Sequence, residues 1–451
     1  MSNELKTIKI SLSDRERNFC EDDQHRSETN LKDLILFTKE NELDEQKPLD
    51  EEKFAKLSAI NISCLELGGL TLSSSAIKLL GDCGAQKLQC LRIYDCLNVN
   101  DEAIKLFGQR FGKTIAHLEM LGNTGVTDVG LKALISSIGN LEVLHLDNAI
   151  GLLAEHRETI TNMRHVWSRI NGDELEKLSQ FTAKYAQYLR HLDITFANTK
   201  EKTPEFIRLL ENLTGLTKLS ITCTANVAIE KELAQLLTKL SVNLTTVNIC
   251  VWMGDGDVLI DAIGKLPKLV QLTLNGRSPM RHIDFRINKT LVPMANLKDL
   301  KNCRLILKNH SKTLLDKFAT HLPKLETLEL EGLDIDDQAL SNLSGLDNLT
   351  FLDIVSPTIT DTGMAALIPK LPNLTFLRIN DFGTDKIWNK TLDSIIGEAS
   401  RRQQVPIEIV FTESCKLDLE SRRNSLPKNL TVSKRNSTHL LSFPGSTPRG
   451  F

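Results

Sequence analysis

The sequence predicts an α/β solenoid, in which strand–helix units repeat along the chain with parallel strands on the concave face and helices on the convex face. Three observations support this fold class. A six-residue pattern recurs at a nearly constant interval, helix-start residues follow many copies, and aromatic residues make up only 5% of the chain, so Leu and Ile must build the core. Self-similarity at a fixed period of about 20 to 50 residues is typical of such arrays.

The repeated pattern is L-x-x-L-x-L, with Ile, Val or Met allowed at the apolar positions. From Ile62 to Leu374 there are 12 steps over 312 residues, a mean period of 26. This count includes a degenerate copy, MRHVWS from Met163, and an imperfect one, LKDLKN from Leu297. A single copy is weak evidence, whereas a dozen copies at near-constant spacing indicate a repeat architecture.

Each copy alternates in the manner of a strand, so positions 1, 4 and 6 face a core while positions 3 and 5 face solvent. A strand–helix unit cannot bury its apolar face alone, and stacked neighbours therefore share one continuous core. Five leucines at position 4 are expected to be fully buried: Leu118, Leu192, Leu219, Leu328 and Leu352.

Turn residues and a helix start follow several copies, as in VNDEAIKLF at 99–107, VTDVGLKALI at 126–135 and ITDTGMAALI at 359–368. Asp101, Asp128 and Asp361 lie where a helix N-cap is expected, ahead of an apolar stripe at helical spacing. In DIDDQAL at 334–340, either Asp336 or Asp337 is expected to cap a helix.

Three segments are predicted along the chain. Residues 1–61 are expected to hold divergent repeats, such as LKTIKI from Leu5 and LKDLIL from Leu31, with acidic insertions. Residues 62–411 form the solenoid, in which PIEIVF at 406–411 is the last strand. Residues 412–451 are basic and rich in Ser, Thr, Pro and Asn without an apolar period, which predicts disorder.

Composition excludes several classes of protein. A net charge of −3 argues against a general nucleic-acid binder. No window approaches about 18 uninterrupted apolar residues, so no membrane span is expected. The opening segment MSNELKTIKISLSD lacks the apolar core of a signal peptide. Without such a signal, the nine cysteines are interpreted as reduced thiols of a cytoplasmic or nuclear protein.

No enzyme motif is present in the sequence: there is no GxxxxGK[ST], no HExxH and no GxSxG. The sequence therefore predicts no reaction, no cofactor and no metal. Cys64 and Cys90 occupy position 3 of neighbouring copies and should lie about 5 Å apart. A disulfide or a metal contact between them is an alternative, but two reduced thiols are favoured because no CxxC pair accompanies them. A metal bound by His165 and His191 is a further alternative.

The candidate binding surface is the concave face. Tyr, Trp and Arg are the residue types that dominate binding hot spots, and they gather on the outward positions of five consecutive copies. Trp167 and Arg169 are the expected anchors, and His165 and His191 predict that partner capture changes between about pH 6 and 7. The full set of candidate partner-binding residues is Arg92, Tyr94, His117, Glu119, His145, Asp147, His165, Trp167, Arg169, His191 and Asp193.

The basic C-terminal segment also holds two candidates for phosphorylation. Ser425 follows Arg422 and Arg423, and Ser437 follows Lys434 and Arg435. Basic residues two and three positions before a serine resemble the sites of basophilic kinases.

The repeats resemble the leucine-rich repeat family, over roughly residues 5–411. LRIYDCLNVNDEAIKLF at 91–107 is similar to the cysteine-containing, ribonuclease-inhibitor-like subclass found in F-box/leucine-rich-repeat proteins. Cys96 occupies the position where that subclass keeps Cys or Asn, and Asn123 occupies it in the next copy. Most other copies carry another residue there, and no stretch resembles an F-box.

The resemblance implies a non-catalytic protein-interaction scaffold that recognises substrates for an SCF-type ubiquitin ligase through an SCF adaptor. The alternative is a ribonuclease-inhibitor-like or GTPase-regulating module that inhibits a partner enzyme. In both cases the expected partner is a protein bound to the concave face, without nucleic acid or membrane.

Overall fold

A computed structural model describes residues 6–11, 31–37, 63–68, 88–96, 99–123, 125–156, 160–171, 174–197, 199–224, 228–277, 284–288, 291–309, 315–316, 318–380, 386–422 and 426–435. The chain divides into two compact units, Met1–Thr195 and Phe196–Phe451, called here the first and the second unit. Each unit is an α/β solenoid, which confirms the predicted fold class. That residues 62–411 form one continuous array stays a prediction, and each unit is described by itself.

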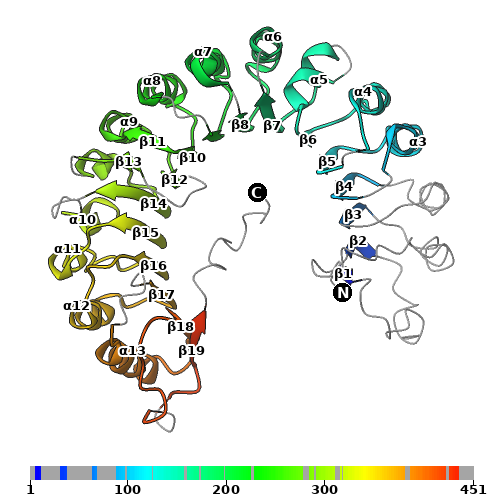
Figure 1. Ribbon diagram of the computed structural model, residues 1–451. Coiled ribbons are helices and arrows are strands. Elements are labelled where there is room, and N and C mark those ends of the chain that lie inside the picture. Colours follow the sequence, from blue (N-terminus) through cyan, green and yellow to red (C-terminus); the bar gives the residue numbers. More distant parts are fainter. Residues whose placement is uncertain are drawn as a thin grey trace, which may run out of the picture. The chain divides into compact units, whose positions relative to one another are not determined.

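In the first unit, parallel strands pair in the order of the sequence from β1 to β7. Backbone N–H groups of Arg190 and His191 donate to the carbonyl oxygen of Arg164 and bring β8 beside β7. The helices lie on one face of this sheet (Figure 1). The elements are β1 (Lys6–Ser11), β2 (Leu31–Phe37), β3 (Cys64–Gly68), β4 (Cys90–Tyr94), α3 (Asp101–Phe111), β5 (His117–Leu121), α4 (Asp128–Ser137), β6 (Val143–Leu146), α5 (Ala149–Glu155), β7 (His165–Asn171), α6 (Leu175–Tyr185) and β8 (His191–Ala197), whose last two residues belong to the second unit.

In the second unit, the parallel order is β9, β10, β12, β14, β15, β16, β17, β18 and β19, and the short strands β11 and β13 pair beside it. Its elements are the 3-10 turn η5 (Lys200–Lys202), α7 (Thr203–Leu210), β9 (Lys218–Cys223), α8 (Glu230–Leu240), β10 (Thr246–Val251), β11 (Met253–Asp255), α9 (Asp257–Ile263), β12 (Gln271–Asn275), β13 (Asp284–Arg286), η6 (Val292–Asn296), β14 (Asn302–Asn309), α10 (Phe318–His321), β15 (Thr327–Leu333), α11 (Asp337–Ser341), β16 (Phe351–Val355), α12 (Asp361–Leu367), η7 (Ile368–Lys370), β17 (Phe376–Asn380), α13 (Asn389–Arg401), β18 (Ile407–Thr412) and β19 (Leu430–Arg435).

The register of the strands agrees with the repeat pattern at most copies. All five position-4 leucines singled out in the sequence are at most 1% exposed, which confirms their expected burial. The degenerate copy from Met163 is also in register, because His165 lies opposite Val143 and Trp167 opposite His145. Its Ser168 replaces the usual apolar residue at position 6, is fully buried, and accepts a hydrogen bond from the backbone N–H of Ile150 at the start of α5.

For the imperfect copy, the predicted first residue, Leu297, is wrong by three residues. Asn302 lies opposite Gln271 and Cys303 opposite Leu272, so the copy begins at Leu300 and Cys303 takes position 4. Leu297 and Leu300 are both fully buried, and Leu297 corresponds to the leucine that precedes each strand-starting leucine by three residues, such as Leu266 before Leu269. Two leucines with the same spacing and the same burial made the register ambiguous.

The helix caps lie one residue earlier than predicted at three helices. Asn100, Thr127 and Thr360 are the N-caps, and their side chains accept backbone hydrogen bonds from Ala103, Val129 and Gly363 respectively. Asp336 caps α11, as one of the two expected alternatives.

The aspartates that follow these caps join one repeat to the next. The carboxylate of Asp101 accepts hydrogen bonds from the backbone N–H and the hydroxyl of Thr127, at 2.7 and 2.6 Å. Asp337 contacts Thr360 in the same way, at 3.3 and 2.7 Å. The starts of α4 and α12 are therefore each held by their own cap and by an aspartate of the preceding repeat.

This contact explains the T-D-x-G sequence shared by 127–130 and 360–363. A Cβ atom at Gly130 would overlap the Asp101 carboxylate, and one at Gly363 would overlap the Asp337 carboxylate. Glycine is required there because the carboxylate of the preceding repeat occupies the space of a side chain.

The segment after β18 is folded where disorder was predicted, so the predicted boundary at 412 is wrong for the described part of that segment. Strand β19 pairs in parallel with β18 along six residues, and the Asn429 amide donates to three carbonyl oxygens at the end of α13. Leu-Pro-Lys-Asn-Leu at 426–430 is a copy of Leu-Pro-Asn-Leu at 371–374 with one inserted residue. The inserted residue concealed the period.

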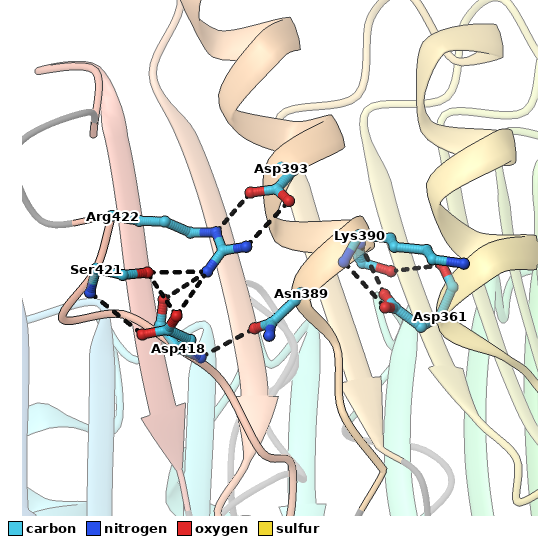
Figure 2. A network of polar contacts seen from close by, with 8 residues as sticks. Asp361, Asn389, Lys390, Asp393, Asp418, Ser421 and Arg422 are labelled. Carbon is cyan, nitrogen blue, oxygen red and sulfur yellow. Dashed lines mark hydrogen bonds and ion pairs between the residues drawn. The ribbon is translucent and has the colours of Figure 1, made fainter.

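A polar network fastens this segment to α13 (Figure 2). The Arg422 guanidinium donates to both carboxylate oxygens of Asp393, at 2.5 and 3.1 Å. The backbone N–H of Asp418 donates to the side chain of Asn389.

The same view shows the contact between α12 and α13 (Figure 2). Asp361 accepts hydrogen bonds from the backbone N–H groups of Lys390 and Thr391, which is the inter-repeat contact described above.

We expect Gly363→Ala to lower the free energy of unfolding by about 1–3 kcal/mol, because the new methyl group must displace the Asp337 carboxylate. The double variant Gly363→Ala/Asp337→Ala should lose less than the sum of the two single variants, by about 0.5–3 kcal/mol. Gly397→Ala in α13 is the matched control: its methyl group would meet no atom within 4 Å. It should stabilise the helix by about 0.5–1 kcal/mol. Urea unfolding measures all four variants, and additive losses would contradict the contact.

Leu118→Ala in the first unit and Leu352→Ala in the second should each lower the unfolding free energy by about 2–5 kcal/mol, because each removes a fully buried side chain. Val129→Ala is the control, since Val129 is 72% exposed and its change should stay within about 0.5 kcal/mol. A loss below about 0.5 kcal/mol at either leucine would show that the register of that unit is wrong.

Candidate functional site

The outward positions of strands β4 to β8 form two columns on the side of the first unit's sheet that faces away from its helices. This surface is called the strand face. Cys90 lies opposite His117 and, two residues on, Arg92 lies opposite Glu119. Glu119 lies in turn opposite His145, and His145 opposite Trp167. The register therefore brings the predicted residues of four neighbouring strands together.

The predicted residues differ in how much surface they offer. Two are covered: Glu119 is 5% exposed and Tyr94 is 8% exposed, so these two side chains offer little surface to a partner. Asp147 and Arg169 are exposed, with their charged groups 4.0 Å apart. The remaining seven are half-buried: Arg92, His117, His145, His165, Trp167, His191 and Asp193.

Glu119 is covered because its neighbours surround it with polar groups. Its Oε1 lies 2.5 Å from Nε2 of His117, 3.4 Å from Nδ1 of His145 and 3.3 Å from Nε of Arg92. The Tyr94 hydroxyl donates to Oε2. Arg92 also contacts Glu66 on the preceding strand, β3, at 3.5 Å.

These contacts decide the ionisation of the carboxylate. Burial alone would raise the pKa of Glu119, but hydrogen bonds from His117, His145 and Tyr94 outweigh it and hold that pKa well below its usual range. Burial and the hydrogen bond to Glu119 raise the pKa of Tyr94 well above its usual value. Tyr94 therefore stays a protonated donor beside a charged acceptor.

Four histidine rings form a row that extends from this carboxylate across the strand face. The ring centroids are 5.8 Å apart for His117 and His145, 4.6 Å for His145 and His165, and 5.2 Å for His165 and His191, each pair in an edge-on arrangement. Burial, followed by the like charges of its histidine neighbours, lowers the pKa of His165 to about 3. A lowered pKa keeps His165 neutral between about pH 6 and 7, so the expected change in partner capture over that range, which stays a prediction, would have to come from another group.

Cys64 and Cys90 are neighbours, as expected, since the register places them directly opposite each other. Neither forms a disulfide bond. A hydrogen bond to Cys64, together with burial, raises the pKa of the Cys90 thiol. A thiol with a raised pKa is a poor nucleophile at neutral pH, because the thiolate is the reactive form.

The strand face of the second unit carries a different set of side chains. Phe351 and Phe376 stack with centroids 4.5 Å apart and nearly parallel rings. Arg378 forms an ion pair with Asp353, and Arg304 forms one with Glu329 at 3.0 Å. These charges are partnered within the fold.

The sequence interpretation missed the Glu119 cluster as a single site. The signal was present: His117 and Glu119 are two residues apart on one strand, and His145 takes the same outward position as Glu119 in the next copy. Ser425 and Ser437, the candidates for phosphorylation, lie outside the described residues. Within the described residues, no helix is both long enough and apolar enough to cross a membrane.

No protein-family model matches the chain, and no curated protein matches it. Among solved structures, the chain is similar to an internalin from Listeria monocytogenes, with 17% identity, a TM-score of 0.42, and 85% of this chain and 88% of that chain covered. It is similar to a leucine-rich repeat protein of Leptospira interrogans, with 18% identity, a TM-score of 0.42, and 87% and 96% covered. It is also similar to the Rad7 and Elc1 complex in yeast, with 15% identity, a TM-score of 0.41, and 77% and 76% covered.

These likenesses concern the fold. The chain's own repeats, with leucines buried at position 4 and parallel strands in register, build the α/β solenoid of each unit. Asn123 shows one device of these repeats: its side chain accepts from the backbone N–H of Cys96 and donates to the carbonyl oxygen of Ile93 in the preceding copy. Solenoids of this kind present an extended surface for binding other proteins.

The three tyrosines of the chain provide a graded test of the Glu119 cluster. Tyr94→Phe should lower the unfolding free energy by about 1.5–3 kcal/mol, because it removes a hydrogen bond to a charged group. Tyr185, which is 1% exposed and donates to the carbonyl oxygen of Ile160, should lose about 0.5–1.5 kcal/mol in the same change. Tyr188 is 61% exposed and should change by less than about 0.5 kcal/mol. Urea unfolding measures the order, and equal losses at Tyr94 and Tyr188 would contradict the cluster.

Proposed function

We propose that the chain is a non-catalytic protein-interaction scaffold whose partner binds the strand face of the first unit. One observation carries this proposal: half-buried rings of His145, His165 and Trp167 lie together on consecutive strands, with the exposed guanidinium of Arg169 beside them. A merely solvated surface would be built from Lys, Glu and Ser. Rings and an arginine held by a rigid sheet lose little conformational entropy when a partner covers them.

Trp167 and Arg169 are the proposed anchors. Trp167 lies on β7, opposite His145. Arg169 follows on the same strand, where its backbone N–H donates to the carbonyl oxygen of Asp147 and its side chain is 45% exposed. The guanidinium is therefore available to a partner while its backbone is fixed.

Trp167→Ala and Arg169→Ala should each weaken partner capture by roughly 30-fold or more, which corresponds to about 2 kcal/mol at a hot spot. The measurement is affinity capture with quantitative mass spectrometry, using the full chain and each variant as bait. Phe351→Ala on the second unit is the matched control, since it also removes a half-buried aromatic ring from a strand face. Circular dichroism establishes that each variant is folded.

Two outcomes would decide against this surface. If both first-unit variants capture the same proteins as the native chain, the anchors are wrong. If Phe351→Ala abolishes capture while Trp167→Ala does not, the binding surface lies on the second unit.

Substrate recognition within an SCF-type ubiquitin ligase is the more specific form of this function. It rests on the resemblance of residues 91–107 to the repeats of F-box/leucine-rich-repeat proteins, in a chain where no F-box is recognisable. The alternative is a module that inhibits a partner enzyme. Co-purification with the SCF adaptor and a cullin would support the first, whereas capture of one enzyme, inhibited on addition of the purified chain, would support the second.

A further inference from the structure

The Glu119 cluster has the composition of a metal site as well as that of a hydrogen-bond network. His117, Glu119 and His145 each offer one donor atom, and these atoms all lie within 4.8 Å of one another. The donors come from two adjacent parallel strands, β5 and β6, whose register fixes their spacing. Two imidazole nitrogens and one carboxylate oxygen are a common donor set for zinc and for other divalent transition metals.

The geometry of the cluster is close to what an ion needs. In a tetrahedral zinc site the bonds are about 2.0–2.1 Å long, so two donor atoms lie about 3.3 Å apart. Nδ1 of His145 is 3.4 Å from Oε1 of Glu119, which fits without any change. Nε2 of His117 is 2.5 Å from the same oxygen, so these two donors must separate by roughly 1 Å. Metal binding therefore requires a rotation of the half-buried His117 side chain, while the donor atoms of all three residues already lie within 4.8 Å of one another.

The groups around Glu119 orient it as a ligand. The Tyr94 hydroxyl donates to Oε2, which leaves Oε1 directed toward the two histidine rings. Second-shell hydrogen bonds of this kind orient carboxylate ligands in metal sites. Arg92 lies 3.3 Å from Oε1 and would repel a cation, but it also pairs with Glu66 on its other side.

His145 has a second ring nitrogen that takes no part in the Glu119 cluster. Nε2 of His145 is covered from solvent and has no hydrogen-bond partner among the described residues. A buried polar atom without a partner costs free energy, and such atoms are uncommon in folded proteins. An imidazole can rotate about its Cβ–Cγ bond, so His145 can offer either nitrogen to an ion. The network within the protein uses only one of them.

We propose that His117, Glu119 and His145 bind a divalent transition-metal ion, with zinc the best match to the donor set. The fourth coordination position is open, and His165, whose ring centroid is 4.6 Å from that of His145, is the nearest further imidazole. Open positions of this kind accept water or a side chain from outside. The ion lies on the face assigned to the partner, but its binding is a property of the chain alone and does not rest on the proposed function.

Metal binding is tested on the purified full chain, freed of affinity tags and stripped with a chelator. Isothermal titration with zinc chloride should show one ion per chain, and cobalt in its place should give the visible absorption of a low-coordinate site. His117→Ala, His145→Ala and Glu119→Gln should each weaken zinc binding roughly tenfold or more. Mutation of a residue that only orients a metal ligand costs about 10- to 100-fold in affinity, and removal of a ligand itself should cost at least as much. Circular dichroism shows whether each variant is folded.

Two control variants make the assignment specific. His321→Ala removes a histidine of the second unit, from α10, and should leave zinc binding unchanged. Cys64→Ser/Cys90→Ser removes the thiols that precede His117 in the same column and should also leave it unchanged. The absence of stoichiometric binding to the native chain would overturn the proposal. Loss of binding in the cysteine variant, with native affinity in the histidine variants, would assign the ion to the thiols and overturn it equally.

Discussion

The structure depends on one constraint: each strand–helix repeat must bury its apolar positions against the repeats on either side. This fixes the register of adjacent strands, because a shift by one residue would turn the position-4 leucines toward solvent. Leu118 and Leu144 are accordingly opposite each other and fully buried. The contact of Asp337 with Thr360 fixes the spacing of neighbouring repeats on the helix side in the same way. Gly363 leaves room for the Asp337 carboxylate.

A fixed register also places every outward side chain in a column with its equivalents on neighbouring strands. In the first unit one such column joins Arg92, Glu119, His145 and Trp167. Spacings of about 5 Å between strands allow these groups to contact one another. Glu119 is therefore enclosed by its neighbours, whereas Arg169, at the far end of its strand, is exposed. The strand face has a polar, internally bonded part around Glu119 and a part around Trp167 and Arg169 to which the partner is assigned in the proposed function.

The same arrangement can serve two purposes that do not exclude each other. The Glu119 carboxylate accepts a hydrogen bond from Tyr94 and is flanked by two imidazoles, and these contacts hold the side chains of neighbouring strands together. His117, Glu119 and His145 also offer three donor atoms within 4.8 Å of one another, which is the basis of the proposed ion site. An ion bound there would add a positive charge beside the open part of the face and would so change which partners the face attracts.

The repeat, its period, the burial of the position-4 leucines and the strand register at most copies could be predicted from the residues alone, because apolar periodicity is a local property of a sequence. The spacing of the neighbouring copies also predicted the register at Met163, but not at Leu300, where two equally buried leucines three residues apart produce the same pattern. The last repeat at 426–430 was present in the sequence but concealed by one inserted residue. The three-dimensional contacts were needed to establish that Thr127 rather than Asp128 caps its helix and that Glu119 is enclosed. Both depend on which side chains of adjacent repeats share the same space, and those contacts join residues about 26 positions apart.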